Sequence, residues 1–313
     1  MKKDLSPICP DTTVGVDPHE WIPRNFEGFL KELDHIIDSC DGRCPLFRGH
    51  ADRRWLLESS FVRTCKKLLL DVEPHIRPSQ EIRESVEYHQ ALFGLLLLKY
   101  DVLVRPSAEL RDLETQRGAD AMFEMLKHFQ QFPEDDKATL KGTFYLDWTQ
   151  NRDVGLFFAN FHSDEHSISE RNTDGTLFIC DKTVAGKCLM REESNEAIRV
   201  EKIIELMREK NNTPENDEGF GCPLLFYPPR QIYCQRADNQ EAAYWAQMDL
   251  RYDLEYIWSL KEKDGERHDY ILRKLILPCE SQKECADYLC GKGITHSYLF
   301  PISSRVLDAP GEG

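Results

Sequence analysis

The sequence predicts an α+β protein, a single domain in which a mixed, mostly antiparallel central sheet is flanked by several helices. Segments with apolar residues three and four positions apart, typical of amphipathic helices, alternate with short apolar runs typical of strands. The chain of 313 residues is 41% hydrophobic, which is enough to bury one sizeable core. We therefore expect an N-terminal arm over residues 1–24 and one domain over residues 25–313.

Periodicity locates the helices. Apolar residues from Phe26 to Ile37 recur on one helical face, and Asn25 is placed to cap the start of that helix. A second stripe, at 154–161, predicts a packed helix with Thr149 as its candidate cap. The other expected helices begin near Phe61, cover about 79–99, 107–129 and 197–210, or follow the capping box Ser281–Glu284.

Short apolar runs bounded by turn residues predict the strands. They lie at 45–47, 143–146, 176–180, 224–227, 231–234, 270–277 and 297–300. The polar stretches at 132–141, 163–174 and 211–219 are expected to be loops. No internal repeat or low-complexity tract interrupts this pattern.

The charge balance bears on the partners of the protein. The 55 acidic and 40 basic residues give a formal charge of −15, so most of the surface should repel nucleic-acid backbones and anionic lipid headgroups. The apolar runs, such as Leu95 to Leu98, are far shorter than the roughly 20 residues that cross a bilayer. We expect a cytoplasmic protein with no membrane partner and no bulk nucleic-acid binding.

The 11 cysteines are spread along the chain, and no apolar leader segment accompanies them. They are therefore predicted to be reduced thiols. The closest pairs, Cys40 with Cys44 and Cys285 with Cys290, lack the two-residue spacing of paired zinc ligands. No metal site is expected.

An ordered series of motifs runs through the chain. In sequence these are Phe47-Arg48-Gly49, Trp55-Leu56, Ser60-Phe61, Arg63, Lys127-His128-Phe129, Gly142-Thr143, Leu146-Asp147-Trp148-Thr149 and Phe157-Phe158-Ala159. The series resembles the FRG domain family, which is named for its Phe-Arg-Gly motif. Weaker matches follow at Ile232, Gln235, Leu289–Ile294 and Leu299-Phe300-Pro301. The motif core would cover about 45–162, and further strands and helices 175–301.

The chain also departs from the family pattern. Phe144 and Gln231 stand where arginine is common, and Ala237 replaces a glycine. An insertion separates His128 from Leu146. If those arginines contact a ligand in other members, this chain would bind the ligand differently or lack the activity.

The resemblance implies a function of a general kind. Members of the family are frequent in bacteria and phages and occur near mobile and defence-like genes. This implies an effector that binds a phosphate-bearing or nucleotide-like ligand, in phage defence or toxicity. Arg48 on an early strand and Gln235 on a late one are similar to the layout of ADP-ribosyltransferases, which would make NAD the candidate cofactor. The chain lacks the Ser-Thr-Ser strand and the E-x-E motif of those enzymes.

Arg48 is the first candidate site residue. Its planar, always charged guanidinium suits a phosphate or a carboxylate, and Gly49 beside it would let another group approach the backbone closely. The alternative is a structural ion pair between Arg48 and Asp147, which would join the two motif blocks without a ligand.

Asp147, Trp148 and Thr149 form the second candidate group, at a predicted junction between a strand and a helix. Asp147 would act as a base or orient Arg48 or His128, and Trp148 would stack on a planar ring. In the alternative interpretation, Asp147 and Thr149 satisfy backbone donors at the helix start and Trp148 fills the core.

His128 and Gln235 complete the candidate set. His128 would bind the ligand or serve as a hydrogen-bonded packing residue of its helix, and Gln235 would support catalysis with Arg48 and Asp147. No Walker loop, dinucleotide fingerprint, esterase elbow or zinc-protease motif occurs in the sequence. The rival hypothesis is a non-catalytic interaction module whose motif residues serve only the fold.

Overall fold

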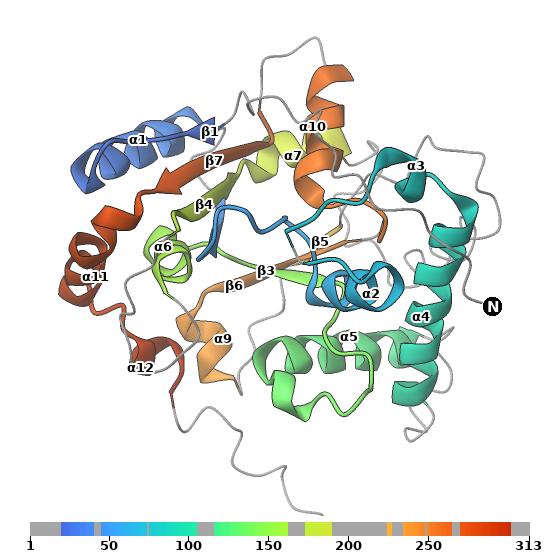
Figure 1. The fold of residues 1–313 in the computed structure, drawn as a ribbon. Helices are drawn as coiled ribbons and strands as arrows, with labels where there is room; N and C mark the ends of the chain where they lie inside the picture. Colours follow the sequence, from blue (N-terminus) through green and yellow to red (C-terminus); the bar gives the residue numbers. More distant parts are fainter. Residues whose placement is uncertain are drawn as a thin grey trace, which may run out of the picture.

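A seven-stranded sheet runs through the described part of the protein (Figure 1). The computed structural model describes residues 20–40, 45–73, 75–104, 116–161, 173–189, 224–226, 234–247, 249–264 and 270–301. The strands are β1 (Glu20–Trp21), β2 (Leu46–His50), β3 (Tyr145–Thr149), β4 (Gly175–Cys180), β5 (Leu224–Phe226), β6 (Ala242–Ala246) and β7 (Leu272–Leu277).

The strands lie side by side in the order β1-β7-β4-β2-β3-β6-β5. β1 and β7 run parallel, and the other neighbouring strands run antiparallel. The predicted α+β class with a mixed, mostly antiparallel sheet is therefore confirmed.

Helices flank this sheet. They are α1 (Phe26–Ser39), α2 (Ser60–Leu70), α3 (Gln80–Arg83), α4 (Val86–Val104), α5 (Gln116–Gln131), α6 (Arg152–Asn160), α7 (Lys182–Leu189), α9 (Gln235–Asn239), α10 (Leu254–Asp264), α11 (Gln282–Gly291) and α12 (His296–Leu299). Two 3₁₀ turns lie at Pro133–Asp135 and Cys279–Ser281. None of the described helices combines the length and the apolar character needed to cross a membrane.

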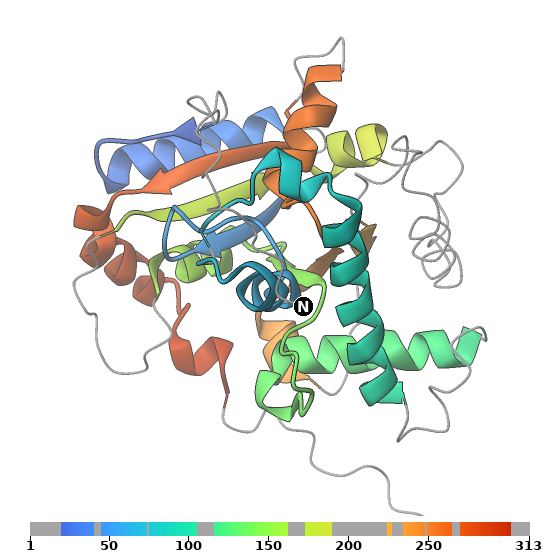
Figure 2. The ribbon, with the colours of Figure 1, turned by 45° about the vertical axis from the view of Figure 1, so that its right-hand side comes forward.

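Alternation along the strands divides the core into parts. Leu46 and Phe178 pack with α7 and α10, whereas their neighbours Phe47 and Leu177 pack with α1, α6 and α11. Tyr145 packs with α2, α4 and α5 in a third cluster. Figures 1 and 2 show α1 and α11 together on one side of the molecule and α4 and α5 together on the other.

Several local predictions are confirmed. Asn25 caps α1, because its side chain accepts a hydrogen bond from the Gly28 N–H at 2.8 Å. The strand predicted at 176–180 is β4. The strand predicted at 45–47 is longer than expected, since β2 continues to His50 and so contains the whole Phe-Arg-Gly motif.

The single helix predicted at 79–99 is wrong, because the structure has α3 and α4 there. Ser85 explains the break. Its hydroxyl donates to the Ile82 carbonyl at 2.9 Å and accepts from the Tyr88 N–H at 3.2 Å. One serine thus closes the first helix and caps the second.

The strand predicted at 297–300 is also wrong, since this segment is α12. Thr295 accounts for the difference, because its Oγ1 accepts from the Tyr298 N–H at 3.3 Å and caps a helical turn. The capping box at Ser281 does not form, although α11 begins at Gln282 as expected.

Some predicted elements lie wholly or partly outside the described residues. The helix at 197–210, the loop at 211–219 and residues 231–233 lie outside them. The helix predicted at 107–129 is described from Gln116 as α5. At the end of the predicted arm, Glu20 and Trp21 pair with β7, so this part of the arm belongs to the sheet.

Gly49 fixes the distance between β2 and α6. A Cβ atom at this position would lie 2.1 Å from the Ala159 nitrogen and 2.2 Å from the Gly155 carbonyl oxygen, both backbone atoms of α6. Backbone atoms cannot move aside as a flexible side chain can. Only glycine therefore allows the strand and the helix to approach this closely.

We expect Gly49→Ala to lower the free energy of unfolding by about 1–3 kcal/mol or more, because the added methyl group overpacks β2 against α6. Gly94→Ala is the matched control, since nothing lies within 4 Å of a Cβ atom there. This change within α4 should raise stability by about 0.5–1 kcal/mol. Denaturant unfolding measures both, and an unchanged Gly49→Ala variant would contradict the packing argument.

Candidate functional site

The neighbouring strands β2 and β3 pair with each other at one registered position. Phe47 of β2 lies opposite Thr149 of β3, whereas on their other sides β2 pairs with β4 and β3 with β6 over five positions each. Arg48 and Asp147 lie just beyond the Phe47–Thr149 position. Beyond this position, backbone carbonyls of β3 accept hydrogen bonds from side chains in place of β2.

Arg48 reaches across this opening. One terminal nitrogen, Nη1, donates to the backbone carbonyl of Asp147, and Nε donates to Nε2 of His50 at 3.0 Å. The guanidinium thus supplies a hydrogen bond that a paired strand would otherwise supply. The structure shows a contact to the Asp147 backbone, in place of the side-chain ion pair considered from the sequence.

Two further arginines reach the same region from helices. Arg63 of α2 donates from Nη1 to the Glu58 carbonyl at 2.8 Å. Arg236 of α9 donates from Nη1 to the Gln131 carbonyl, and its guanidinium carbon lies 4.4 Å from the centre of the Phe300 ring. The buried Nε of Arg236 has no hydrogen-bond partner among the described residues.

Asp147 lies at the common point of these charges. Its Oδ1 accepts from the side-chain amide of Gln130 at 3.0 Å, and the same amide donates to the Tyr145 carbonyl at 3.2 Å. The amide oxygen of Gln130 accepts in turn from the Thr143 hydroxyl at 2.7 Å. Gln130 therefore fixes the orientation of the carboxylate.

Burial dominates the electrostatics of this cluster. It lowers the pKa of Arg48 to about 10, against the attraction of Asp147. It also lowers the pKa values of Arg63 and Arg236. Burial raises the pKa of Asp147, against the attraction of Arg48, the Gln130 hydrogen bond and the attraction of Arg236 and Arg63.

The charges of these groups do not balance. Arg48, Arg63, Asp147 and Arg236 all keep partial solvent exposure. Three positive groups and one carboxylate give these four residues a formal charge of +2, in a protein whose total is −15, while Glu58 nearby also attracts Arg63. We name these four residues the arginine cluster.

Several arginines elsewhere are paired with carboxylates, whereas Arg273 also donates to a carbonyl, that of Tyr270, at 3.2 Å. Arg77 makes a two-point ion pair with Asp253, at 2.7 and 3.0 Å. Arg54 and Arg251 likewise contact carboxylates, those of Asp52 and Asp249. Within the described part of the chain, the three arginines of the cluster are instead held by carbonyl oxygens and a histidine nitrogen. None of the three makes a side-chain ion pair with a described residue, although Asp147 attracts all three and Glu58 attracts Arg63.

Trp148 and Thr149 lie in structural positions. Trp148 is 2% exposed and packs near Trp258 in the core, which agrees with the packing interpretation. Thr149 donates to the Gln240 carbonyl at 2.6 Å and accepts from the Asn151 N–H at 3.0 Å. The prediction that Thr149 caps α6 is wrong, because β3 continues through it and Asn151 caps the helix.

His128 and Gln235 lie apart from the arginine cluster. His128 is exposed, and its Nε2 is 2.9 Å from Oδ2 of Asp135. Gln235 is exposed at the first position of α9, while the next residue, Arg236, belongs to the cluster. Gly49 is adjacent to Arg48 but is packed against α6.

Sequence reasoning did not select Arg63, Gln130 or Arg236 as site residues. Arg63 belongs to the series of family motifs, and Arg236 directly follows the candidate Gln235, so the sequence near each residue could have indicated it. Gln130 had none beyond its place two residues after His128. Convergence of three separate helices on β3 is a tertiary property that spacing alone does not reveal.

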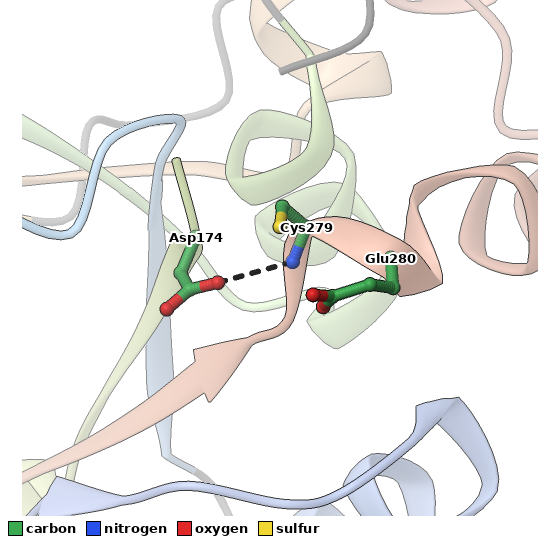
Figure 3. A group of neighbouring side chains, drawn as sticks. All are labelled: Asp174, Cys279 and Glu280. Carbon is green, nitrogen blue, oxygen red and sulfur yellow. Dashed lines mark hydrogen bonds between the residues drawn. The ribbon is translucent and has the colours of Figure 1, made fainter. Parts of the chain in front are cut away.

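A second polar group consists of Asp174, Cys279 and Glu280, whose ligand-type atoms lie within 4.8 Å of one another (Figure 3). Asp174 accepts from the Cys279 N–H at 3.1 Å and from Nη1 of Arg53 at 3.1 Å. Burial, Glu280 and Asp174 raise the pKa of the Cys279 thiol, which disfavours the thiolate that a metal would need. These contacts account for the group as a junction between β4 and β7.

No family model, no curated protein and no solved structure matches this chain. The resemblance to the FRG family therefore stays a prediction, and we infer a function from the arginine cluster alone.

We expect Arg63→Met to lower the free energy of unfolding by only about 1 kcal/mol, because relief of the repulsion from Arg48 offsets part of what is lost, namely one hydrogen bond and the attraction of Glu58 and Asp147. Arg77→Met is the contrasting variant. It leaves the buried Asp253 without its partner and should cost about 3–5 kcal/mol. Denaturant unfolding without ligand compares the two, and equal losses would identify Arg63 as architectural.

Proposed function

We propose that this protein binds a phosphate-bearing, nucleotide-like ligand at the arginine cluster. The observation that carries the proposal is the convergence of Arg48, Arg63 and Arg236 around one carboxylate without side-chain ion pairs to described residues. Keeping three guanidinium groups partly desolvated and close together costs free energy. Such an arrangement is typical of a site that binds an anion.

The arginines retain many donors for this purpose. A guanidinium has five N–H groups, and the hydrogen bonds to described residues use two of Arg48 and one each of Arg63 and Arg236. The remaining groups can form paired hydrogen bonds with phosphate oxygens. Because these side chains are fixed by their own contacts, little rotamer entropy is lost when the anion binds.

The formal charge supports phosphate over carboxylate. A site of about +2 is neutralised by a phosphate dianion, whereas a single carboxylate would leave one charge over. Asp147 also offers an oxygen, Oδ2, for which the structure gives no hydrogen-bond partner among the described residues. A hydroxyl or amino group beside the phosphate would satisfy it, as nucleotides and phosphorylated sugars can.

The proposal concerns binding, and the transferase-like form has weaker support. In that form Gln235 would act beside Arg48 and Asp147, but Gln235 is exposed at the start of α9. The buried positions of Trp148 and Thr149 are compatible with the rival function, a non-catalytic interaction module. They do not separate the two functions, because these residues can be structural under either, so the arginines decide between them.

We expect Arg48→Lys to weaken the binding of pyrophosphate and of adenine and nicotinamide nucleotides by about tenfold or more, because the planar fork is lost while the charge remains. The matched control is Arg54→Lys, whose side chain is 60% exposed and paired with Asp52. It should bind as the wild type does. Calorimetric titration measures both, and absence of anion binding to the wild type would refute the proposed function.

We expect the affinity for sulfate, whose charge is constant over this range, to rise as the pH falls through the pKa of Asp147. That pKa is raised from its usual 3.8. Protonation removes the negative charge and takes the cluster from +2 to +3. Asp147→Asn should bind sulfate tightly at every pH, with the pH dependence flattened. A weaker Asp147→Asn variant would contradict this electrostatic account.

A further inference from the structure

His50 is held rigidly beside Arg48. The two residues are two positions apart on β2, so their side chains leave the same face of the strand. His50 is 4% exposed. Its ring meets Phe178 edge to face, with centroids 5.0 Å apart, and Trp55 similarly at 6.1 Å. The imidazole therefore has little freedom to turn.

The hydrogen bonds determine the tautomer of His50. Nε of Arg48 can only donate, so Nε2 of His50, 3.0 Å away, must accept and carries no proton. Nδ1 lies 3.3 Å from the Trp55 carbonyl, which can only accept. The neutral ring with its proton on Nδ1 satisfies both contacts at once.

We propose that His50 is the positioning residue of the anion site, and that its unprotonated Nε2 holds the Nε edge of Arg48 so that the other N–H groups face the ligand. The inference rests on the proposed function for its ligand. The contact itself is independent of any ligand, since Arg48 also spans the opening between β2 and β3 in the structure described.

The contact matters because Arg48 has few other fixed points. Without Nε2 of His50, the Nε–H of Arg48 would lose its acceptor, and the Arg48 side chain would regain rotamer freedom. Ligand binding would then have to remove that freedom. A residue that fixes a ligand-binding side chain through its own packing and hydrogen bonds raises affinity by pre-organisation.

The surroundings of His50 keep it neutral. A protonated imidazole would direct a second donor at the Arg48 guanidinium. Burial lowers the pKa of His50 well below its usual range, and the positive charges of Arg48, Arg63 and Lys274 act in the same direction. The hydrogen bond to the Trp55 carbonyl opposes them. The acceptor is therefore present throughout neutral and mildly acidic pH.

Two variants separate the acceptor from the ring. His50→Phe keeps an aromatic ring against Phe178 and Trp55 but removes both nitrogens. His50→Gln can place an amide oxygen near the position of Nε2 and so restore the acceptor. With pyrophosphate as the probe, we expect His50→Phe to bind at least about tenfold more weakly. We expect His50→Gln to stay within about threefold of the wild type.

A spectroscopic measurement tests the positioning without any ligand. Long-range ¹H–¹⁵N correlation spectra at pH 5.5 should show one histidine as the neutral Nδ1–H tautomer, and the His50→Phe variant assigns it by loss of that signal. The Arg48 Nε–H should exchange slowly with solvent in the wild type and in His50→Gln, and quickly in His50→Phe. Melting temperatures establish that both variants fold.

The outcomes are distinct. A charged His50 or an Nε2–H tautomer at pH 5.5 would overturn the positioning role whatever the protein binds. Pyrophosphate binding by His50→Phe at wild-type strength would overturn it too, while leaving the anion site intact. If the tautomer and the slow exchange are found but neither pyrophosphate nor nucleotides bind, the proposed function fails and the contact between His50 and Arg48 stands.

Discussion

The hydrogen bond from Arg48 to the Asp147 carbonyl is the interaction on which the centre of this structure depends. β2 and β3 are neighbours but share one registered position, so the sheet would otherwise carry an unsatisfied carbonyl at its middle. The guanidinium satisfies that group and places a positive charge there. Gly49 makes this geometry available, because it lets β2 pack directly on the backbone of α6.

Charged groups in the interior divide into two kinds. Glu58 with Lys66 at 2.6 Å, and Lys99 with Asp136 at 2.8 Å, are buried ion pairs that join α2 and α4 to the segments around them. Each partner compensates the other, although burial still raises the pKa of Glu58 to about 7 against the attraction of Lys66. In the arginine cluster three guanidinium groups face the one carboxylate of Asp147, with a further attraction of Glu58 on Arg63. This imbalance is the basis on which we propose a ligand there.

Local chemistry explains which sequence predictions succeeded. Asn25 and the apolar stripe after it act within one helix, so α1 could be predicted well. Ser85 and Thr295 changed the outcome elsewhere because one hydroxyl bond can end or start a helix without altering the apolar pattern. The place of Trp148 in the core depended on which face of β3 would be covered, which the motif alone left open.

The sequence by itself determined the α+β class and most of the strands and helices within the described residues, and it proposed Arg48 and Asp147 as candidate site residues. Periodicity and capping act over a few neighbouring residues, and such signals survive in a single sequence. Only the tertiary structure decided that Arg63, Gln130 and Arg236 join them and that His50 orients Arg48, whereas His128 and Gln235 stay at the surface. Electrostatic convergence is decided by how α2, α5 and α9 pack around an opening in the sheet, and that packing depends on contacts between residues far apart in the chain.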